Sequence, residues 1–386
     1  MSLRVLISAG EASGDLYAAS LVRALRRHFP DADFLGCAGP RMQAEGVRTI
    51  VDAHSLSVVG LIEVVSHLPR IFGEFRKLIA AARAERPDFA ILTDSPDFHL
   101  RVARKLKPLG VPVIYLVAPQ AWAWRKDRLP SIRKTVRRLL CIFPFEEAFF
   151  REHGVDAHYI GHPLTRLVRP NLDRQTFLDS LGLPLDRPLV ALLPGSRPGE
   201  ISRHLPALAK AVELIEAQWP CSFVVGAPPG FSRGWKRPFF WERFLRRSIQ
   251  VVEGTTWELL AHADLALAAS GTVTIEAAIL GTPMVVYYRV SRASWWMGRF
   301  LVRVPFFSMV NLIAGRRIVP ELIQDELTGE RLSNEVLRLL GDPAAMTKMR
   351  AELAEDRRRL DTDRDPMDRA VDLIVSVLDK ELVHDS

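Results

Sequence analysis

The stretch from Leu265 to Arg289 constrains the fold of this chain more than any other. It opens with an apolar run that is typical of a buried strand, and the small residues after it predict a turn. Apolar residues then recur at helical spacing until Gly281 and Pro283, which end a helix. A second apolar run, 284–287, predicts another buried strand. The order strand, turn, helix, strand is that of a βαβ unit in a parallel sheet.

The turn of this unit has the chemistry of an anion site. Its backbone N–H groups lie at a helix start, where the helix dipole favours negative charge. Gly271 permits a tight turn, and the hydroxyl of Thr272 or Thr274 can cap the helix. Ser270 adds a hydroxyl, and the Glu276 carboxylate can accept hydrogen bonds from the hydroxyls of a ribose. The turn therefore predicts a phosphate site beside a ribose site, and the alternative is an ordinary crossover with a capped helix.

The N-terminus has the same order of elements. Residues 4–8 predict a strand, residues 10–15 (GEASGD) predict a glycine turn, and the residues up to Phe29 predict a helix. The spacing is not the GxGxxG of dinucleotide sites, and Glu11 and Asp15 would repel a pyrophosphate. We expect this loop to face a substrate that carries hydroxyl groups, or to serve the fold alone.

Two aspartates follow the strand that is predicted for residues 89–92. Asp94 and Asp97 stand in the sequence TDSPDF directly after it. Ligands of open parallel sheets bind at the carboxyl ends of the strands, so both carboxylates are placed where a general base would act. A helix cap and turn is the alternative, which Asp-Ser-Pro also favours.

A second domain is predicted to begin near Pro188, after a polar and turn-rich stretch. Its first strand, 189–193, ends in the sequence PGSRPGE. Gly195 lets the backbone approach a ligand closely, and Arg197 offers a planar guanidinium that suits a diphosphate. Strands and helices alternate with short connections throughout, so we expect an α/β fold of two domains, each with a parallel sheet, in this chain of 386 residues.

Charge and cysteine content narrow the classes of function. The net charge of +7 and the isoelectric point near 9.5 favour an anionic partner, such as a nucleotide, a nucleic acid or an anionic membrane. The three cysteines are far apart, which disfavours a zinc site or a disulfide framework and indicates a reducing compartment. The sequence shows no signal-peptide apolar region and no uncharged apolar run of about 18 residues, so we expect no membrane-spanning helix.

Three segments combine apolar or aromatic residues with basic ones: 61–79, 231–247 and 294–307. Each pattern fits contact with a bilayer interface. The first is also typical of a core-facing helix, bent near Pro69, and the other two are typical of surface helices. The segment 231–247 would also suit single-stranded nucleic acid. Two aromatic segments in one chain favour the membrane interpretation.

Eight separated motifs occur in one order along nearly the whole chain: GEASGD, TDSPDF, APQAWAWR, FPFE, GHPL, LLPGSRPGEI, ASGTVTIEAAILGTPMVVYYR and NLIAGR. In these motifs the chain resembles the lipid-A-disaccharide synthases, a family of inverting, metal-independent glycosyltransferases. The resemblance implies the GT-B fold, in which two Rossmann-like domains have parallel sheets that face a cleft. It implies an acceptor and membrane domain over residues 1–165 and a UDP-sugar domain over 188–360. A C-terminal helix over 361–386 would pack back across the domain junction.

The family's activity is the transfer of 2,3-diacylglucosamine from UDP-2,3-diacylglucosamine to the 6-hydroxyl of 2,3-diacylglucosamine 1-phosphate (lipid X). The expected products are a β(1→6)-linked disaccharide and UDP, in the lipid A (lipopolysaccharide) biosynthesis of Gram-negative bacteria. The resemblance implies no cofactor, no metal and no nucleic acid. Its implied partners are the cytoplasmic face of the inner membrane and a second copy of the chain, which exchanges its C-terminal segment in a homodimer.

The resemblance also implies roles for individual residues. Asp94 matches the family's candidate base, with Asp97 and Glu11 as orienting or acceptor-binding groups, and Arg197 stabilises the leaving diphosphate. The residues implied to bind the UDP-sugar are Gly195, Ser196, Arg197, Ser270, Gly271, Thr272, Thr274, Glu276 and Asn311.

The chain departs from the family at two places. It has Ala118-Pro119-Gln120 where the family often has a serine pair, and residues 231–247 match no family motif; both concern the handling of the acceptor. One rival is another UDP-sugar transferase acting on a lipid carrier, which should lack GEASGD and AWAWR. A second is a nucleic-acid-binding protein, which would bind oligonucleotides with steep salt dependence and would not need Asp94. No GxGxxG opens either domain, which disfavours a nicotinamide dehydrogenase.

Overall fold

The computed structural model describes residues 3–56, 61–228, 231, 249–292, 294–296 and 304–384, and for 61–67 and 380–384 it describes the backbone alone. Residues 232–247 and 297–303 of the two aromatic segments, and the side chains of 61–67, therefore lie outside the described residues. The chain divides into two compact units, Met1–Pro163 with Leu360–Ser386 and Leu164–Arg359. Each unit is an α/β structure with one parallel sheet, which confirms the predicted fold class.

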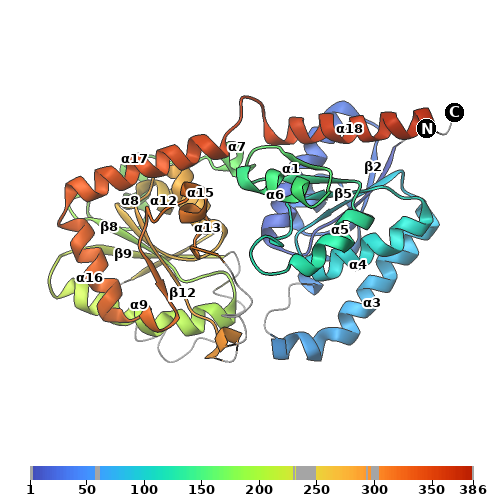
Figure 1. The fold of residues 1–386 in the computed structure, drawn as a ribbon. Coiled ribbons are helices and arrows are strands. Elements are labelled where there is room, and N and C mark those ends of the chain that lie inside the picture. Colours follow the sequence, from blue (N-terminus) through green and yellow to red (C-terminus); the bar gives the residue numbers. More distant parts are fainter. Residues whose placement is uncertain are drawn as a thin grey trace. The chain divides into compact units, whose positions relative to one another are not determined.

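The first unit has a seven-stranded parallel sheet in the order β3-β2-β1-β4-β5-β6-β7. Its strands are β1 Arg4–Ser8, β2 Asp33–Ala38, β3 Arg48–Asp52, β4 Phe89–Thr93, β5 Val113–Leu116, β6 Arg138–Cys141 and β7 Ala157–Tyr159. Its helices are α1 Ala12–His28, α2 Pro40–Ala44, α3 Leu61–Glu85, α4 Pro96–Leu106, α5 Leu129–Thr135, α6 Pro144–Glu152 and α18 Pro366–His384. The central strands β4 and β5 are buried along their whole length because helices cover both faces of this sheet (Figure 1).

The second unit has a six-stranded parallel sheet in the order β10-β9-β8-β11-β12-β13. Its strands are β8 Leu189–Leu193, β9 Ser222–Ala227, β10 Gln250–Glu253, β11 Leu265–Ala269, β12 Met284–Tyr288 and β13 Glu321–Ile323. Its helices are α7 Leu164–Leu167, α8 Arg174–Ser180, α9 Pro198–Glu216, α12 Thr256–His262, α13 Thr272–Leu280, α15 Met309–Ala314, α16 Gly329–Leu340 and α17 Pro343–Leu360. The βαβ unit predicted from residues 265–289 is therefore β11, α13 and β12.

The chain reverses its direction of travel across each sheet once. In the first sheet the reversal lies between β1 and β4, and in the second it lies between β8 and β11. At such a switch point the loops after the two neighbouring strands diverge and leave room for a ligand. The loops there hold GEASGD and TDSPDF in the first unit, and PGSRPGE and SGTVT in the second. The topology thus brings four of the motifs together in two pairs.

The apolar stripe of α3 enters the core only in its second half. Leu78 and Ile79 are buried beneath the sheet, in one cluster with residues of α4 and α5. Leu68 and Phe72 are instead 48% and 60% exposed. The interpretation of the stripe as core is confirmed for the end of the helix and is wrong for these two residues, which remain largely open to solvent.

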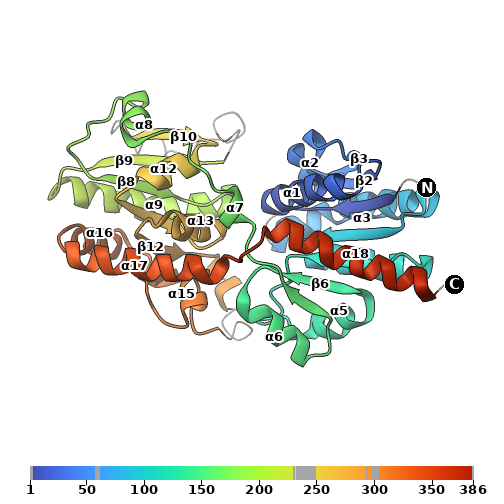
Figure 2. The ribbon, with the colours of Figure 1, turned by 90° about the horizontal axis from the view of Figure 1, so that it is seen from above.

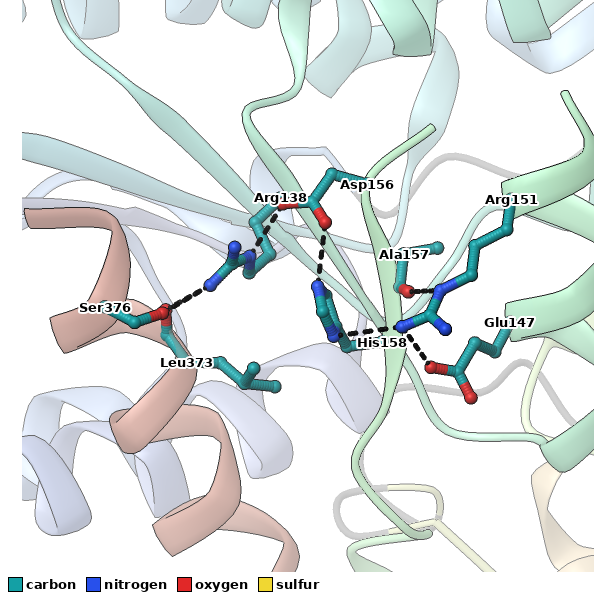
Figure 3. A network of polar contacts seen from close by, with 8 residues as sticks. All are labelled: Arg138, Glu147, Arg151, Asp156, Ala157, His158, Leu373 and Ser376. Carbon is teal, nitrogen blue, oxygen red and sulfur yellow. Dashed lines mark hydrogen bonds and ion pairs between the residues drawn. The ribbon is translucent and has the colours of Figure 1, made fainter. Parts of the chain in front are cut away.

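The C-terminal helix α18 packs against α1, which lies more than 300 residues earlier in the sequence (Figure 2). A buried arginine on β6 fixes it there (Figure 3). The guanidinium of Arg138 donates to the carbonyl of Leu373 at 2.8 Å and to the hydroxyl of Ser376 at 2.6 Å. Its Nε donates to Asp156 at 2.8 Å, and His158 contacts the other oxygen of that carboxylate. The charge of Arg138 is thereby balanced inside the first unit.

Candidate active site

The carboxylate of Asp94 lies against the start of helix α1. The backbone N–H of Gly10 donates to its Oδ1 at 2.8 Å, and that of Glu11 donates to its Oδ2 at 3.1 Å. The side chain of Asp94 is only 12% exposed. A helix start is a favourable place for a carboxylate because its N–H groups are otherwise unpaired and the helix dipole attracts negative charge. The GEASGD loop therefore binds the carboxylate of Asp94 through its backbone N–H groups.

The backbone of Asp94 is left-handed, with φ of 52°, and so is that of Ser95, with φ of 33°. Such angles cost free energy in residues with a side chain, so the surroundings must stabilise them. The Asp94 carbonyl accepts hydrogen bonds from His99 Nδ1 at 3.0 Å and from the Tyr115 hydroxyl. Because a carbonyl only accepts, the proton of His99 is on Nδ1, and Nε2 accepts from the Ser8 hydroxyl at 2.7 Å. This network fixes the direction of the carboxylate.

Two glycines leave the space that the carboxylate occupies. A Cβ on Gly14 would lie 1.7 Å from Asp94 Oδ2, and a Cβ on Gly10 would lie 2.4 Å from the Ser95 hydroxyl oxygen. Both distances are impossible for real atoms. The two glycines of GEASGD are therefore required by the close approach of residues 94–95 to helix α1.

Changing Gly14 to alanine should lower kcat by at least tenfold, because the new methyl group must displace the Asp94 carboxylate. It should also lower the melting temperature, although alanine favours a helix over glycine by about 1 kcal/mol. Gly73 in α3 is the matched control, since a Cβ there meets nothing within 4 Å. Gly73→Ala should keep full activity and gain stability. Full activity in Gly14→Ala would show that the carboxylate does not need this position.

The surroundings raise the pKa of Asp94 to about 8. Burial is the largest cause, and the nearby Glu11 carboxylate is the next; together they outweigh the N–H groups of Gly10 and Glu11, which lower the pKa. Burial also lowers the pKa of His99 to about 4, so its ring is neutral. A carboxylate with a pKa near neutral pH is a stronger base than an ordinary aspartate, which suits proton abstraction.

Asp97 has a different environment. Its carboxylate is 68% exposed and binds Arg128 at 2.8 Å, with Arg125 3.7 Å away. Because the carboxylate is open to solvent and already bound by cations, its position is less suited to proton abstraction. Asp15 is structural, because it accepts from the backbone N–H groups of Gly39, Arg41 and Met42 at the start of α2.

The motifs AWAWR and FPFE meet in the fold. The indole of Trp122 donates to Glu146 Oε1 at 3.1 Å, and Glu146 Oε2 accepts from the backbone N–H groups of Ile142 and Phe143. Glu146 is fully buried, and burial raises its pKa to about 8. These two motifs hold the loop after β5 against the start of α6.

In the second unit, Arg197 stands at the cap position of α9. Its Nη1 is 3.4 Å from Glu200 Oε1, the same oxygen that accepts from the Tyr288 hydroxyl at 3.0 Å. The guanidinium is 37% exposed, so it can still meet a ligand. Gly195 has φ of +116°, and a Cβ there would lie 3.0 Å from Glu200, which explains the glycine. Ser196 is exposed at the tip of this turn.

A buried histidine joins this loop to the end of β12. The Nδ1 of His204 contacts the Pro194 carbonyl at 2.8 Å, and its Nε2 accepts from the backbone N–H of Arg289 at 3.0 Å. These two partners require one proton, on Nδ1. Burial lowers the pKa of His204, which keeps the ring neutral. The imidazole of His204 therefore links the loop after β8 to the loop after β12 by one hydrogen bond to each.

The start of α13 differs from its prediction. Gly271 is the cap residue and no side chain caps the helix, so capping by Thr272 or Thr274 is wrong. Thr272 is exposed in the first turn, and the Thr274 hydroxyl donates to the Gly271 carbonyl at 2.7 Å. A Cβ on Gly271 would meet nothing within 4 Å, so the fold itself does not need this glycine. The first N–H groups of α13 thus have no side-chain cap, and that of Thr274 donates to the Gly271 carbonyl at 3.1 Å.

The other residues predicted for this site lie around the same helix. The Ser270 hydroxyl donates to the Phe307 carbonyl at 2.9 Å, and Glu276 is half-buried on the first turns of α13. Asn311 is fully buried: its amide donates to Val319 O and Glu321 and accepts from two backbone N–H groups. Asn311 therefore supports the loop beside Ser270 and does not face a ligand, which corrects its predicted place among the binding residues.

Sequence reasoning missed the residues that hold the loops, which are the partly buried Tyr288 and the buried His99, Tyr115, Glu200 and His204. Glu200 carried a signal, since it follows Arg197 by three residues in PGSRPGE. Within the described part of the chain, no group of three or more histidine, cysteine, aspartate or glutamate side chains is arranged to hold a metal ion. In the same part, no helix is long and apolar enough to cross a membrane.

Comparison with known proteins gives one family. The model of the family described as lipid-A-disaccharide synthetase matches residues 5–369. The lipid-A-disaccharide synthase of Solibacter usitatus is 57% identical over 381 residues, which are 99% of each chain. That of Myxococcus xanthus is 46% identical over 361 residues, which are 92% of this chain and 93% of the relative.

Solved structures agree on the fold. The UDP-GlcNAc 2-epimerase of Neisseria meningitidis, bound to UDP-GlcNAc, has a TM-score of 0.63 at 11% identity, over 98% of this chain and all of its own. A calicheamicin glycosyltransferase has a TM-score of 0.58 at 17% identity, over 98% of each chain. At these identities the likeness concerns the fold alone: two Rossmann-like domains with parallel sheets, as in GT-B glycosyltransferases and epimerases.

Proposed function

Because this chain belongs to the lipid-A-disaccharide synthetase family, we propose that it uses Asp94 as the base and Arg197 on the leaving group of a sugar transfer. The chain is a glycosyltransferase with the function of a lipid A disaccharide synthase in lipid A biosynthesis. The donor is UDP-2,3-diacylglucosamine and the acceptor is 2,3-diacylglucosamine 1-phosphate.

Asp94 takes the proton from the 6-hydroxyl of the acceptor as that oxygen attacks the anomeric carbon of the donor. The bond from this carbon to UDP breaks on the opposite face, so the configuration inverts to a β(1→6) link. Support comes from the position of the carboxylate at the switch point, held by two N–H groups, and from its pKa of about 8. Glu11 contributes by raising that pKa and by lying beside the place of the acceptor.

The UDP that leaves carries new negative charge on its diphosphate. Arg197 and the N–H groups at the starts of α9 and α13 are proposed to stabilise it, as fixed donors that need no rearrangement. Gly195, Ser196, Ser270, Gly271, Thr272 and Thr274 form the two loops around the diphosphate. Glu276 would accept from the ribose hydroxyls. Support comes from the pairing of these loops at the second switch point.

The observation that carries the proposal is the buried Asp94 carboxylate at the first switch point. The test is a transfer assay on purified protein with UDP-2,3-diacylglucosamine and 2,3-diacylglucosamine 1-phosphate. Release of UDP together with the disaccharide is expected. If UDP is released only with another lipid-linked acceptor, the fold and the donor site stand and the acceptor is wrong.

We propose that the chain works on the cytoplasmic face of the inner membrane as a peripheral protein. Leu68 and Phe72 are exposed on α3, and Arg70 and Arg76 lie beside them, so apolar and basic groups can meet the bilayer together. The variant Leu68→Ser with Phe72→Ser should lose most of its cosedimentation with vesicles that contain anionic phospholipid. Leu109→Ser, at another exposed leucine, should not. Equal binding by all three proteins would refute this surface.

Exchange of the C-terminal segment in a homodimer stays a proposal, which light scattering would test.

A further inference from the structure

Arg128 places a buried positive charge close to the Asp94 site. Its side chain is 7% exposed and its Nη2 donates to Asp97 at 2.8 Å. Its Nε is buried and has no hydrogen-bond partner among the described residues. An unpaired buried donor costs free energy, and more so in a charged group. The guanidinium therefore has a free donor that a ligand could use.

A second guanidinium lies next to it. Arg125 is 3.7 Å from the Asp97 carboxylate and binds Asp127 through its own side chain. Arg125 and Arg128 both lie over the ring of Trp124, each 5.4 Å from its centre, and this tryptophan is 41% exposed. Stacking on an aromatic ring holds a guanidinium plane in place while its edge stays available. The two guanidinium groups therefore suit the binding of an oxyanion by several N–H donors.

This pair lies near the proposed base. Asp97, its shared carboxylate, lies in the first turn of α4, three residues after Asp94 in the sequence. The charges of Asp94, Arg128 and Asp97 all act on the hydroxyl of Tyr115, which binds the Asp94 carbonyl. The base, Arg128 and Asp97 thus lie around one phenol.

We propose that Arg128, assisted by Arg125, binds the phosphate on the anomeric carbon of the acceptor sugar. This inference rests on the proposed function. The carbon that carries the phosphate and the carbon that carries the 6-hydroxymethyl group are both bonded to the ring oxygen, so the two sites must lie within one sugar ring of each other. Asp97 balances the guanidinium charge until the phosphate, with a charge near −2, displaces its exposed carboxylate. In this proposal Asp97 is neither the base nor a group that binds the acceptor. It pairs with the guanidinium of Arg128 while no phosphate is bound.

The test compares two acceptors, 2,3-diacylglucosamine with and without its 1-phosphate. Arg128→Gln should raise KM for the phosphorylated acceptor about tenfold to a hundredfold and change KM for the other less than about twofold. Arg125→Gln should act the same way but more weakly, because Asp127 already occupies that guanidinium. Arg133→Gln, an exposed arginine on α5, is the control and should change neither. Equal loss with both acceptors would overturn the proposal.

A second measurement does not depend on catalysis. Calorimetric titration with glucosamine 1-phosphate should show binding to the wild type and to Arg133→Gln, and at least tenfold weaker binding to Arg128→Gln. Glucosamine should bind all three alike. Circular dichroism checks that Arg128→Gln is folded, and Arg125→Gln replaces it in this comparison if it is not. If the wild type transfers to neither acceptor but binds the phosphate through Arg128, the proposed function fails and the subsite stands. Equal binding by wild type and Arg128→Gln refutes the subsite.

Discussion

Replacing Asp94 by asparagine should lower kcat by a factor of about 10² to 10⁴, the usual contribution of a general base. KM for both substrates should change little, because the amide keeps the shape of the carboxylate. Asp33→Asn is the matched control: it makes the same charge change at the start of β2, where the carboxylate is 46% exposed. Nearly full activity of Asp94→Asn would mean that another group takes the proton.

The pH dependence gives a second sign of the same base. Only the ionised carboxylate accepts a proton, so kcat/KM of the wild type should rise with pH through about 8. This rise should be absent in Asp94→Asn. Because the folded pKa is above the ordinary value of 3.8, the carboxyl contributes stability at low pH and loses that contribution as the pH rises through about 8. The melting temperature of the wild type should therefore fall, relative to the variant, as the pH rises from about 4 to about 8, and should level off above that.

Replacing Arg197 by glutamine should lower kcat by about 10² to 10³, the cost of removing one donor to a developing oxyanion. The affinity for UDP, measured by calorimetry, should fall as well. Arg197→Lys should have a higher kcat than Arg197→Gln but a lower one than the wild type, since lysine keeps the positive charge but lacks the planar set of guanidinium donors. Arg187→Gln, at an exposed arginine before β8, serves as the control. Unchanged affinity for UDP in Arg197→Gln would place the diphosphate elsewhere.

The sequence predicted the elements of the sheets well because their strands are apolar runs between glycine-rich turns, as at residues 189–199 and 265–271. It also predicted which loops carry the chemistry, since the carboxyl end of a strand can be read from the chain. It could not predict which strands are neighbours. The pairing of β1 with β4 brings GEASGD to Asp94, and these residues are 84 apart.

The roles of single side chains were harder to predict. Asn311 belongs to a motif, and nothing in its sequence says that its amide is fully occupied by Val319, Glu321 and their neighbours. Threonine is a common helix-capping residue, but neither Thr272 nor Thr274 makes a side-chain cap hydrogen bond at the start of α13. The glycine turn that holds Gly10 and Gly14 was expected to face a substrate that carries hydroxyl groups, or to serve the fold alone. The close neighbour is the side chain of Asp94, and only the fold reveals it.

The hydrogen bonds from Arg138 to α18 have a consequence for the order in which the protein folds during synthesis. The first unit is interrupted at Pro163 and resumes only at Leu360, about 200 residues later. A ribosome that adds 5–20 residues per second needs roughly 10 to 40 seconds for that interval. During this time Arg138 lacks both Leu373 and Ser376, and the face of α1 that α18 covers is open to solvent. The N-terminal unit is therefore begun first and completed last.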